Sequence, residues 1–221
     1  MTRSNLELTE FIVKPRRGAL QHMSVGMLGA LFTVMVVAAQ AQTPWPEKPI
    51  RFIVPFTPGG GTDTVTRHLA EKITQDTQWS FLIDNKPGAG GNIGMDLVAK
   101  AKPDGLTLGM GQTSNLAINP SAMAKMPFDA QKDFVPVALV AEIPMVLVVR
   151  TDSAWKNLDD LIRSARAKPE SVKQALAGTG TVGHLAGEML SKKANFKVLS
   201  VPYKGAAPAI TDLLGGQTDY M

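Results

Sequence analysis

Short apolar runs alternate with segments of helical spacing in the first part of the chain. Residues 50–56 are apolar apart from Arg51, which predicts a buried strand. Apolar residues four positions apart follow, at Val65, Leu69 and Ile73, and these share one face of a predicted helix. The sequence Thr-Pro-Gly-Gly-Gly lies between the two, so we expect a tight turn that leads directly into the helix.

The same alternation continues along the rest of the chain. Strands are predicted at residues 81–85, 106–111, 174–177, 199–202 and 218–221, and helices at residues 93–101, 157–167, 185–194 and 206–214. This order predicts an α/β protein with parallel sheets covered by helices. Ligands of such sheets bind beyond the carboxyl ends of the strands.

The pattern changes at residues 133–153, where two apolar runs are separated by the sequence Glu-Ile-Pro. The length suits two extended segments that lead from one lobe of the protein to another. We therefore predict a first α/β lobe over residues 42–140 and a second over residues 141–221.

Three predicted strand ends carry loops that are glycine-rich or small and polar, at residues 57–63, 86–92 and 112–115. The first loop does not fit a nucleotide. Thr62-Asp63 stands where a P-loop needs lysine and then serine or threonine, and the spacing of the dinucleotide fingerprint is absent. An aspartate at the mouth would also repel a phosphate.

Three successive glycines at a helix start leave backbone N–H groups exposed beside the positive end of the helix dipole. A carboxylate fits such a site, and we expect a side chain on Gly60 or Gly61 to block its approach and to be penalised by a positive φ. Asp63 is predicted as the helix N-cap, with its oxygen on the amide near Thr66. The alternative, that the glycines only permit a tight turn, stays open on the pattern alone.

The sequence Gly-Thr-Gly-Thr-Val-Gly-His at residues 178–184 repeats the strand–loop–helix arrangement, so the two loops can form a clamp. His184 lies one turn into the second helix, where a structural role is more common than a catalytic one. No nucleophile elbow, acid/base pair or metal-ligand set is recognisable, which argues against an enzyme, a metal or a cofactor. Whether Tyr203 and Lys204 face the cleft stays open.

Composition and the N-terminus narrow the class of protein. The chain has no cysteine, which excludes disulfides, thiolate metal sites and cysteine nucleophiles. Basic residues at positions 14–17 precede an apolar run from Met23 that ends in Ala-Gln-Ala, so we predict a secretory signal peptide over residues 1–41, cleaved after Ala41. A membrane anchor is the alternative. The formal net charge is +4, but no basic cluster supports nucleic-acid binding.

Six segments occur in an order and spacing that resemble one family: WPEKPIRFIVPFTPGGGTD, NKPGAGGNIG, AKPDGLTLGMG, PFDAQKDFVPVALVAEIPMVLVV, GTGTVGHLAGEML and VPYKGAAPAITDLLGGQTDYM. Together they resemble the solute-binding receptors of tripartite tricarboxylate transporters, the Bug (TctC) family. The resemblance covers Trp45 to Met221. It implies a two-lobed periplasmic-binding-protein fold of type II. It also implies a monomeric, non-enzymatic periplasmic receptor that presents a small organic acid to membrane permease subunits.

The resemblance also implies a ligand site in which loops from both lobes hold a carboxylate. The residues that it assigns are Phe56, Gly60, Gly61, Thr62, Asp63, Thr113, Ser114, Gly178, Thr179, Gly180, Thr181 and His184. The sequence departs from the family at Leu106, where tyrosine is usual, and at Thr181, where serine is common. Neither change removes a backbone donor.

Family members continue beyond the segment that matches GGQTDYM, so we expect a fold that is incomplete at the C-terminus. Two alternatives to transport stay open: a sensor that docks on a membrane signalling partner, and a truncated fragment without function. The identity of the carboxylate is not readable, because selectivity depends on variable loops.

Overall fold

The computed structural model describes residues 45–221. Every helix and strand below belongs to the compact unit Lys48–Met221. The expected leader over residues 1–41 and its cleavage after Ala41 lie outside the described residues. In the part of the chain that is described, no helix combines the length and the apolar composition needed to cross a membrane.

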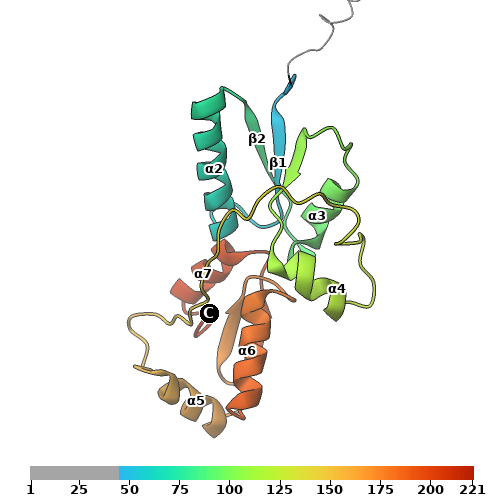
Figure 1. The fold of residues 1–221 in the computed structure, drawn as a ribbon. Coiled ribbons are helices and arrows are strands. Elements are labelled where there is room, and N and C mark those ends of the chain that lie inside the picture. Colours follow the sequence, from blue (N-terminus) through green and yellow to red (C-terminus); the bar gives the residue numbers. More distant parts are fainter. Residues whose placement is uncertain (1–44) are drawn as a thin grey trace, which may run out of the picture. The chain divides into compact units, whose positions relative to one another are not determined.

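Three parallel strands form a first sheet in the order β2-β1-β3 (Figure 1). Its elements are β1 (Ile50–Val54), α2 (Gly61–Thr77), β2 (Phe81–Asn85), the 3₁₀ turn η1 (Ala89–Gly91), α3 (Asn92–Ala99) and β3 (Thr107–Gly109). The first connection moves outward from β1 to β2, and the second returns across β1 to β3. Because such crossovers are right-handed, this reversal puts α2 and α3 on opposite faces of the sheet.

The central strand β1 explains why this sheet forms. Phe52, Ile53 and Val54 are all buried, as expected for a strand that is covered on both faces. The predicted strand at residues 81–85 is confirmed, whereas β1 and β3 are shorter at their carboxyl ends than the apolar runs suggested. The residues left over enter the loops that follow.

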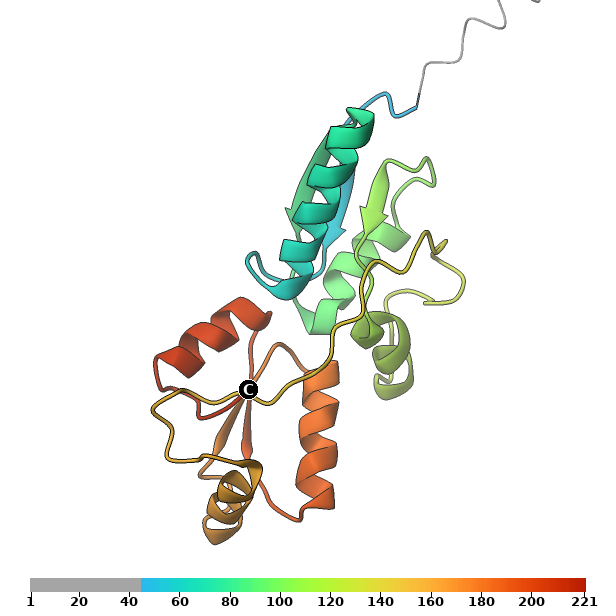
Figure 2. The ribbon, with the colours of Figure 1, turned by 60° about the vertical axis from the view of Figure 1, so that its left-hand side comes forward.

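Two further parallel strands, β4 and β5, form a second sheet (Figure 2). The elements of this part are α5 (Leu158–Ala167), β4 (Lys173–Leu176), α6 (Val182–Lys193), β5 (Leu199–Pro202) and α7 (Ala206–Leu214). Its core contains Leu161, Ala165, Val172, Phe196 and Tyr220. Tyr220 joins the sheet by isolated bridges to Gln174 and Val149, so the expected strand at residues 218–221 is only partly formed.

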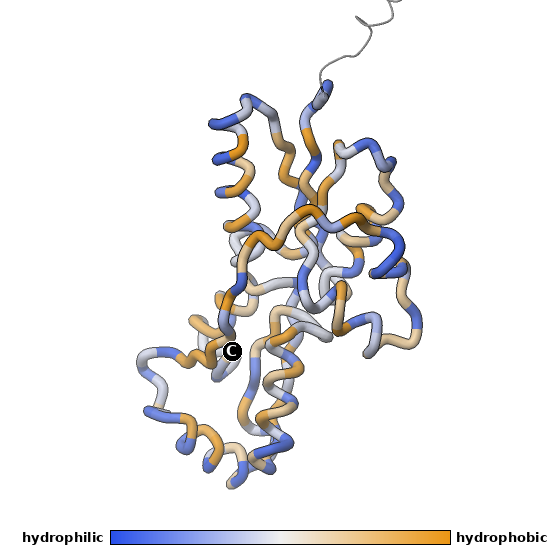
Figure 3. Tube along the Cα trace, in the orientation of Figure 1, coloured by the Kyte–Doolittle hydropathy of each residue, from blue (hydrophilic) through white to orange (hydrophobic). Residues whose placement is uncertain are grey.

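Two segments differ from the sequence prediction. Residues 114–122 form a π-helical turn, η2 (Ser114–Ile118), and a short helix, α4 (Asn119–Ala122), where no element was expected. Residues 134–147, where two extended segments were expected, contain no helix or strand, and the first backbone pairing is the one between Val148 and Met221. Figure 3 shows this segment as a largely hydrophobic trace. The lobe boundary at residue 140 stays a prediction.

Candidate functional site

The loop after β1 turns at Gly59 and enters α2 directly. Gly59 has a φ of 77°, a left-handed conformation that favours glycine, whereas Gly60 has a φ of −78° and is the N-cap of α2. A Cβ on Gly61 would meet no atom within 4 Å. The expectation that positive φ restricts Gly60 and Gly61 is therefore wrong, because the strained position of the turn is Gly59.

The start of α2 presents unpaired backbone donors. Within residues 45–221, the amides of Gly61 and Thr62 have no hydrogen-bond acceptor. The start of α7 lies opposite, since a Cβ on Gly60 would be 3.8 Å from the Cβ of Ala206. Two helix N-termini this close together raise the local positive potential, and this favours an anion near them.

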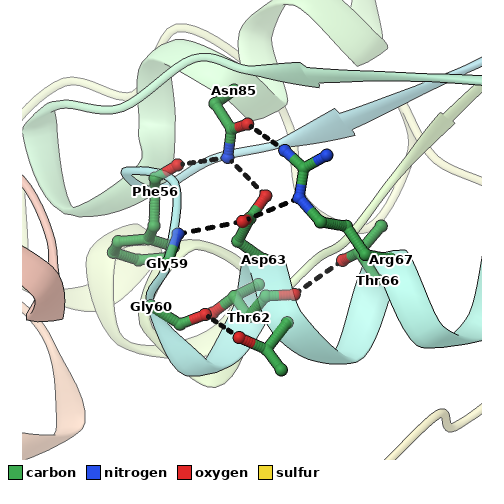
Figure 4. Close-up of polar contacts among 9 residues, drawn as sticks. Phe56, Gly59, Gly60, Thr62, Asp63, Thr66, Arg67 and Asn85 are labelled. Atoms are coloured by element: carbon green, nitrogen blue, oxygen red, sulfur yellow. Dashed lines mark hydrogen bonds and ion pairs between the residues drawn. The ribbon is translucent and has the colours of Figure 1, made fainter.

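Asp63 is not the helix N-cap, which corrects the sequence prediction. It lies in the first turn of α2, it is 2% exposed, and its carboxylate points back under the loop (Figure 4). One oxygen, Oδ2, accepts the Gly59 amide at 2.9 Å and Nε of Arg67 at 2.9 Å. The other, Oδ1, accepts the side-chain amide of Asn85 at 2.9 Å. Direct contact between Asp63 and a ligand stays a prediction.

These contacts determine the charge state of Asp63. Burial opposes ionisation of the carboxyl, but the hydrogen bonds from Arg67, Gly59 and Asn85 and the charge of Arg67 outweigh it and lower the pKa of Asp63 below 3.8. The carboxylate is thus ionised at neutral pH and already neutralised by Arg67. The repulsion of an anion expected from an aspartate at this loop is correspondingly weakened.

The loop after β3 reaches the same helix start. The side-chain amide of Gln112 donates to the hydroxyl of Thr62, which ties the two loops together. Thr113 precedes η2 and is exposed, whereas the Ser114 hydroxyl is buried without a partner among the described residues. Nδ2 of Asn115 is likewise buried and unpaired. Buried polar atoms of this kind call for a ligand or water to satisfy them.

The loop between β4 and α6 is held by its own side chains. Thr181 is the N-cap of α6, accepting the amide of His184 at 3.3 Å and donating to the carbonyl of Gly178 at 2.8 Å. Nδ1 of His184 accepts the Gly180 amide at 3.3 Å. The histidine therefore supports the loop as an acceptor, and α6 begins three residues earlier than predicted because Thr181 caps it.

A cavity of about 150 Å³ lies at the carboxyl ends of the strands. Its lining combines the β1 end, the second glycine loop, the end of α4, the β4 end and the β5 end: Phe56, Gly88, Ala89, Gly90, Gly91, Met123, Ala177, Gly178, Thr179, Pro202, Tyr203 and Lys204. Of the predicted site residues, it brings together Phe56, Gly178 and Thr179. The remaining nine residues do not line the cavity: seven belong to the β1–α2 and β4–α6 segments, and Thr113 and Ser114 follow β3.

Sequence reasoning missed the contribution of Gly88–Gly91, although the loop had been recognised as a strand end. The signal was available, because a glycine-rich sequence at a carboxyl strand end has the same character as the loop after β1. Lys204 lines the cavity, as one of the two open alternatives had it, and it is the one charged residue among the described lining residues. Tyr203 lines the cavity as well, and its hydroxyl donates to Asp212 at 2.6 Å. This bond together with burial raises the pKa of Tyr203 to about 12.

The glycine at position 180 is required by a close approach. Gly180 has a φ of 76°, and a Cβ there would collide with the side-chain oxygen of Asn119. Asn119 is fully buried and donates to Oδ1 of Asn92 at 2.9 Å. The Asn119 side chain therefore packs directly on Gly180, so that α4 contacts the loop before α6 beside the cavity. The described residues contain no cluster of histidine, aspartate or glutamate suited to a metal ion.

Comparison with known proteins identifies the family. Residues 65–221 match the model of the tripartite tricarboxylate transporter family receptor, TctC. The chain belongs to this family. It is a family of transport receptors, so the resemblance inferred from the sequence is confirmed and an enzymatic role is not indicated.

Curated relatives are similar over most of this chain. A UPF0065 protein of Pseudomonas sp. is 38% identical over 206 residues, which cover 93% of this chain and 60% of that protein. Protein BugT of Bordetella pertussis is 36% identical over 200 residues, covering 88% of this chain and 61% of BugT. This chain therefore spans about three fifths of the length of these relatives.

Solved structures agree with the observed fold. The periplasmic binding protein BugD is 37% identical with a TM-score of 0.76, and R. palustris Rpa4515 with adipate is 34% identical with a TM-score of 0.77. MatC from Rhodopseudomonas palustris with bound malate is 32% identical with a TM-score of 0.75. Each match covers 80% of this chain and 59% or 60% of the other. The periplasmic-binding-protein fold is thus confirmed over the part that this chain spans.

Proposed function

We propose that this protein is a periplasmic receptor that captures a small organic carboxylate and presents it to the permease of a tripartite transporter. The observation that carries the proposal is the cavity at the strand ends. Backbone of two glycine-rich loops lines it, Lys204 adds a positive charge, and none of its described lining residues is acidic. A carboxylate gains charge-assisted hydrogen bonds from such donors.

The unpaired amides of Gly61 and Thr62 extend the donor set toward the start of α2. We assign one carboxylate of the ligand to these amides together with the loop at residues 178–184. The lobe boundary near residue 140 is part of this proposal, since it places the two loops on different lobes. The binding of adipate and malate by relatives supports a ligand of the dicarboxylate class.

Export to the periplasm is proposed from the N-terminal leader pattern and from the periplasmic relatives. Handing the ligand to permease subunits is proposed from the family alone. A receptor of this kind releases its ligand chemically unchanged, which separates it from an enzyme on the same scaffold.

The test is a titration of the protein with malate and with adipate, followed by calorimetry and by the amide NMR signals of the glycine loops. We expect saturable binding that shifts Gly61, Gly90 and Gly178, with the ligand recovered intact. The dimethyl esters of the same acids are the matched control, because they keep the shape and lose the charge. Equal binding of acids and esters, or shifts confined to residues remote from these loops, would overturn the proposal.

A further inference from the structure

The hydrogen-bond network beneath the β1–α2 loop uses both polar atoms of the Asn85 side chain. Its Nδ2 group donates to the Phe56 carbonyl at 3.0 Å and to Asp63 at 2.9 Å, and its Oδ1 accepts from Nη2 of Arg67 at 3.1 Å. Asn85 is the last residue of β2, and it pairs with Val54, the last residue of β1. The end of one strand is thereby connected to the loop that leaves the other.

Arg67 completes the network from one turn further along α2. Its Nε lies 2.9 Å from Asp63 Oδ2, and its guanidinium bridges Asp63 and Asn85 in a planar fork (Figure 4). The Arg67 side chain is half exposed, whereas the Asp63 side chain is 3% exposed. The arginine thus compensates a buried carboxylate while its other side faces solvent.

The network sorts the backbone donors of the loop into two groups. Asp63 takes the amide of Gly59 inward, and Gly59 is the residue whose left-handed φ makes the turn. The amides of Gly61 and Thr62, one and two residues past the N-cap, remain unpaired. Without the inward bond the turn loses the contact that fixes the direction of these amides.

We propose that Arg67 and Asn85 are positioning residues for the carboxylate site, acting through Asp63 on the Gly59 turn. The inference rests on the proposed function and deepens it, because it names residues that tune binding without touching the ligand. Neither residue lines the cavity. Asp63 then serves as the internal anion of the loop, leaving the outer amides for the external one.

The first test needs no ligand. Hydrogen exchange of the Gly59 amide is measured in the full chain and in Arg67→Gln and Asn85→Ala. Loss of the charge-assisted bond should speed exchange at Gly59 by about tenfold or more, while amides in the middle of α2 keep their protection. Unchanged exchange at Gly59 in both variants would overturn the positioning role whatever the protein binds.

The second test measures the affinity for malate and adipate in the same variants. We expect about tenfold weaker binding in Arg67→Gln, with partial recovery in Arg67→Lys, which restores the charge but not the fork. Lys72→Gln is the matched control, since it removes a 2.8 Å ion pair with Asp76 on the same helix, far from the loop. A loss of affinity that is equal in Lys72→Gln would show a general effect of helix stability and would refute the proposal.

The two tests separate the possible failures. If the unmodified chain binds neither acid, the proposed function fails, and the exchange of Gly59 still decides the positioning role. If Arg67→Gln does not fold, Arg67→Lys provides the comparison. A lysine can keep the ion pair with Asp63 but not the second bond to Asn85, so the Gly59 amide should exchange faster than in the unmodified chain and more slowly than in Asn85→Ala. Identical exchange in Arg67→Lys and the unmodified chain would count against a role for the fork.

Discussion

At the scale of single residues, Asp63 shows how far a sequence motif can be interpreted. The pattern of glycines followed by Thr-Asp correctly placed an aspartate at the helix start, and the N-cap was the simplest role for it. The structure moves the cap to Gly60, because the chain already turns at Gly59 and leaves Asp63 in the first helical turn. Arg67 lies four residues after Asp63 on the same helix, a spacing at which an ion pair can be read from local sequence, whereas Asn85 comes from the end of β2 and could not be found in this way.

The ionisation of Asp63 gives a prediction about pH. The folded-state pKa of Asp63 lies below its ordinary value of 3.8, which is the value expected in the unfolded chain. The contribution of the ionised carboxylate to stability is therefore fully present above the unfolded-state pKa and is lost as the pH falls through the folded-state pKa. Asp63→Asn should therefore lower the free energy of unfolding by on the order of 1–2 kcal/mol near neutral pH. This range already allows for the weaker ion pair with Arg67, whose half-exposed side chain is screened by solvent.

Denaturant titrations at a series of pH values measure this difference. The two proteins should converge as the pH falls through the lowered folded-state pKa of Asp63. Asp76→Asn is a matched control on the same helix, because its ion pair with Lys72 is exposed. A constant difference between Asp63→Asn and the unmodified chain down to the lowest pH would contradict the assigned role of the charge.

At the scale of secondary-structure elements, periodic apolar segments were predictable and polar ones were not. β2, β5 and α7 have the bounds that the pattern indicated, since each is delimited by a clear change in composition. The turn η2 and helix α4 consist mainly of small or polar residues, and their buried members are Ser114, Asn115 and Asn119. The buried residues of these elements are polar, and only Asn115 and Asn119 among them form side-chain hydrogen bonds, so an apolar pattern held no signal for these elements.

Helix α6 shows the same limit at its start and offers a prediction. The apolar pattern suggested a start at Leu185, but the hydroxyl of Thr181 accepts the amide of His184 and begins the helix at Val182. Thr181→Ala should lower the free energy of unfolding by about 0.5–2 kcal/mol, and Thr181→Ser should stay close to the unmodified protein. Urea denaturation of the three proteins measures both effects. Equal stability of Thr181→Ala and Thr181→Ser would mean that the cap contributes nothing.

At the scale of the whole molecule, the extended segment before the second sheet was expected to link two lobes, and its exposure was not foreseen. Val135, Val137 and Leu139 are 89%, 82% and 79% exposed. An apolar run that pairs with no strand along residues 135–147 leaves both its side chains and its backbone available to another chain. The apolar pattern of such a segment does not indicate which residues pack against it, so its exposure could not be predicted.

The exposed segment leads to a prediction about association. Val137→Lys combined with Leu139→Lys should reduce self-association of the chain, because a charge on an unpaired strand disfavours pairing with other chains. The free energy of unfolding should change by no more than about 0.5 kcal/mol, since neither side chain is buried. Leu161→Ala is the opposite control, because Leu161 is 1% exposed in the second core and its truncation should cost about 2–5 kcal/mol.

Sedimentation velocity at several concentrations, together with denaturant unfolding, measures both quantities. Unchanged sedimentation in the lysine variant would mean that the segment is not the surface through which the chain associates. A large loss of stability in that variant would mean that residues 135–147 pack against the fold in solution.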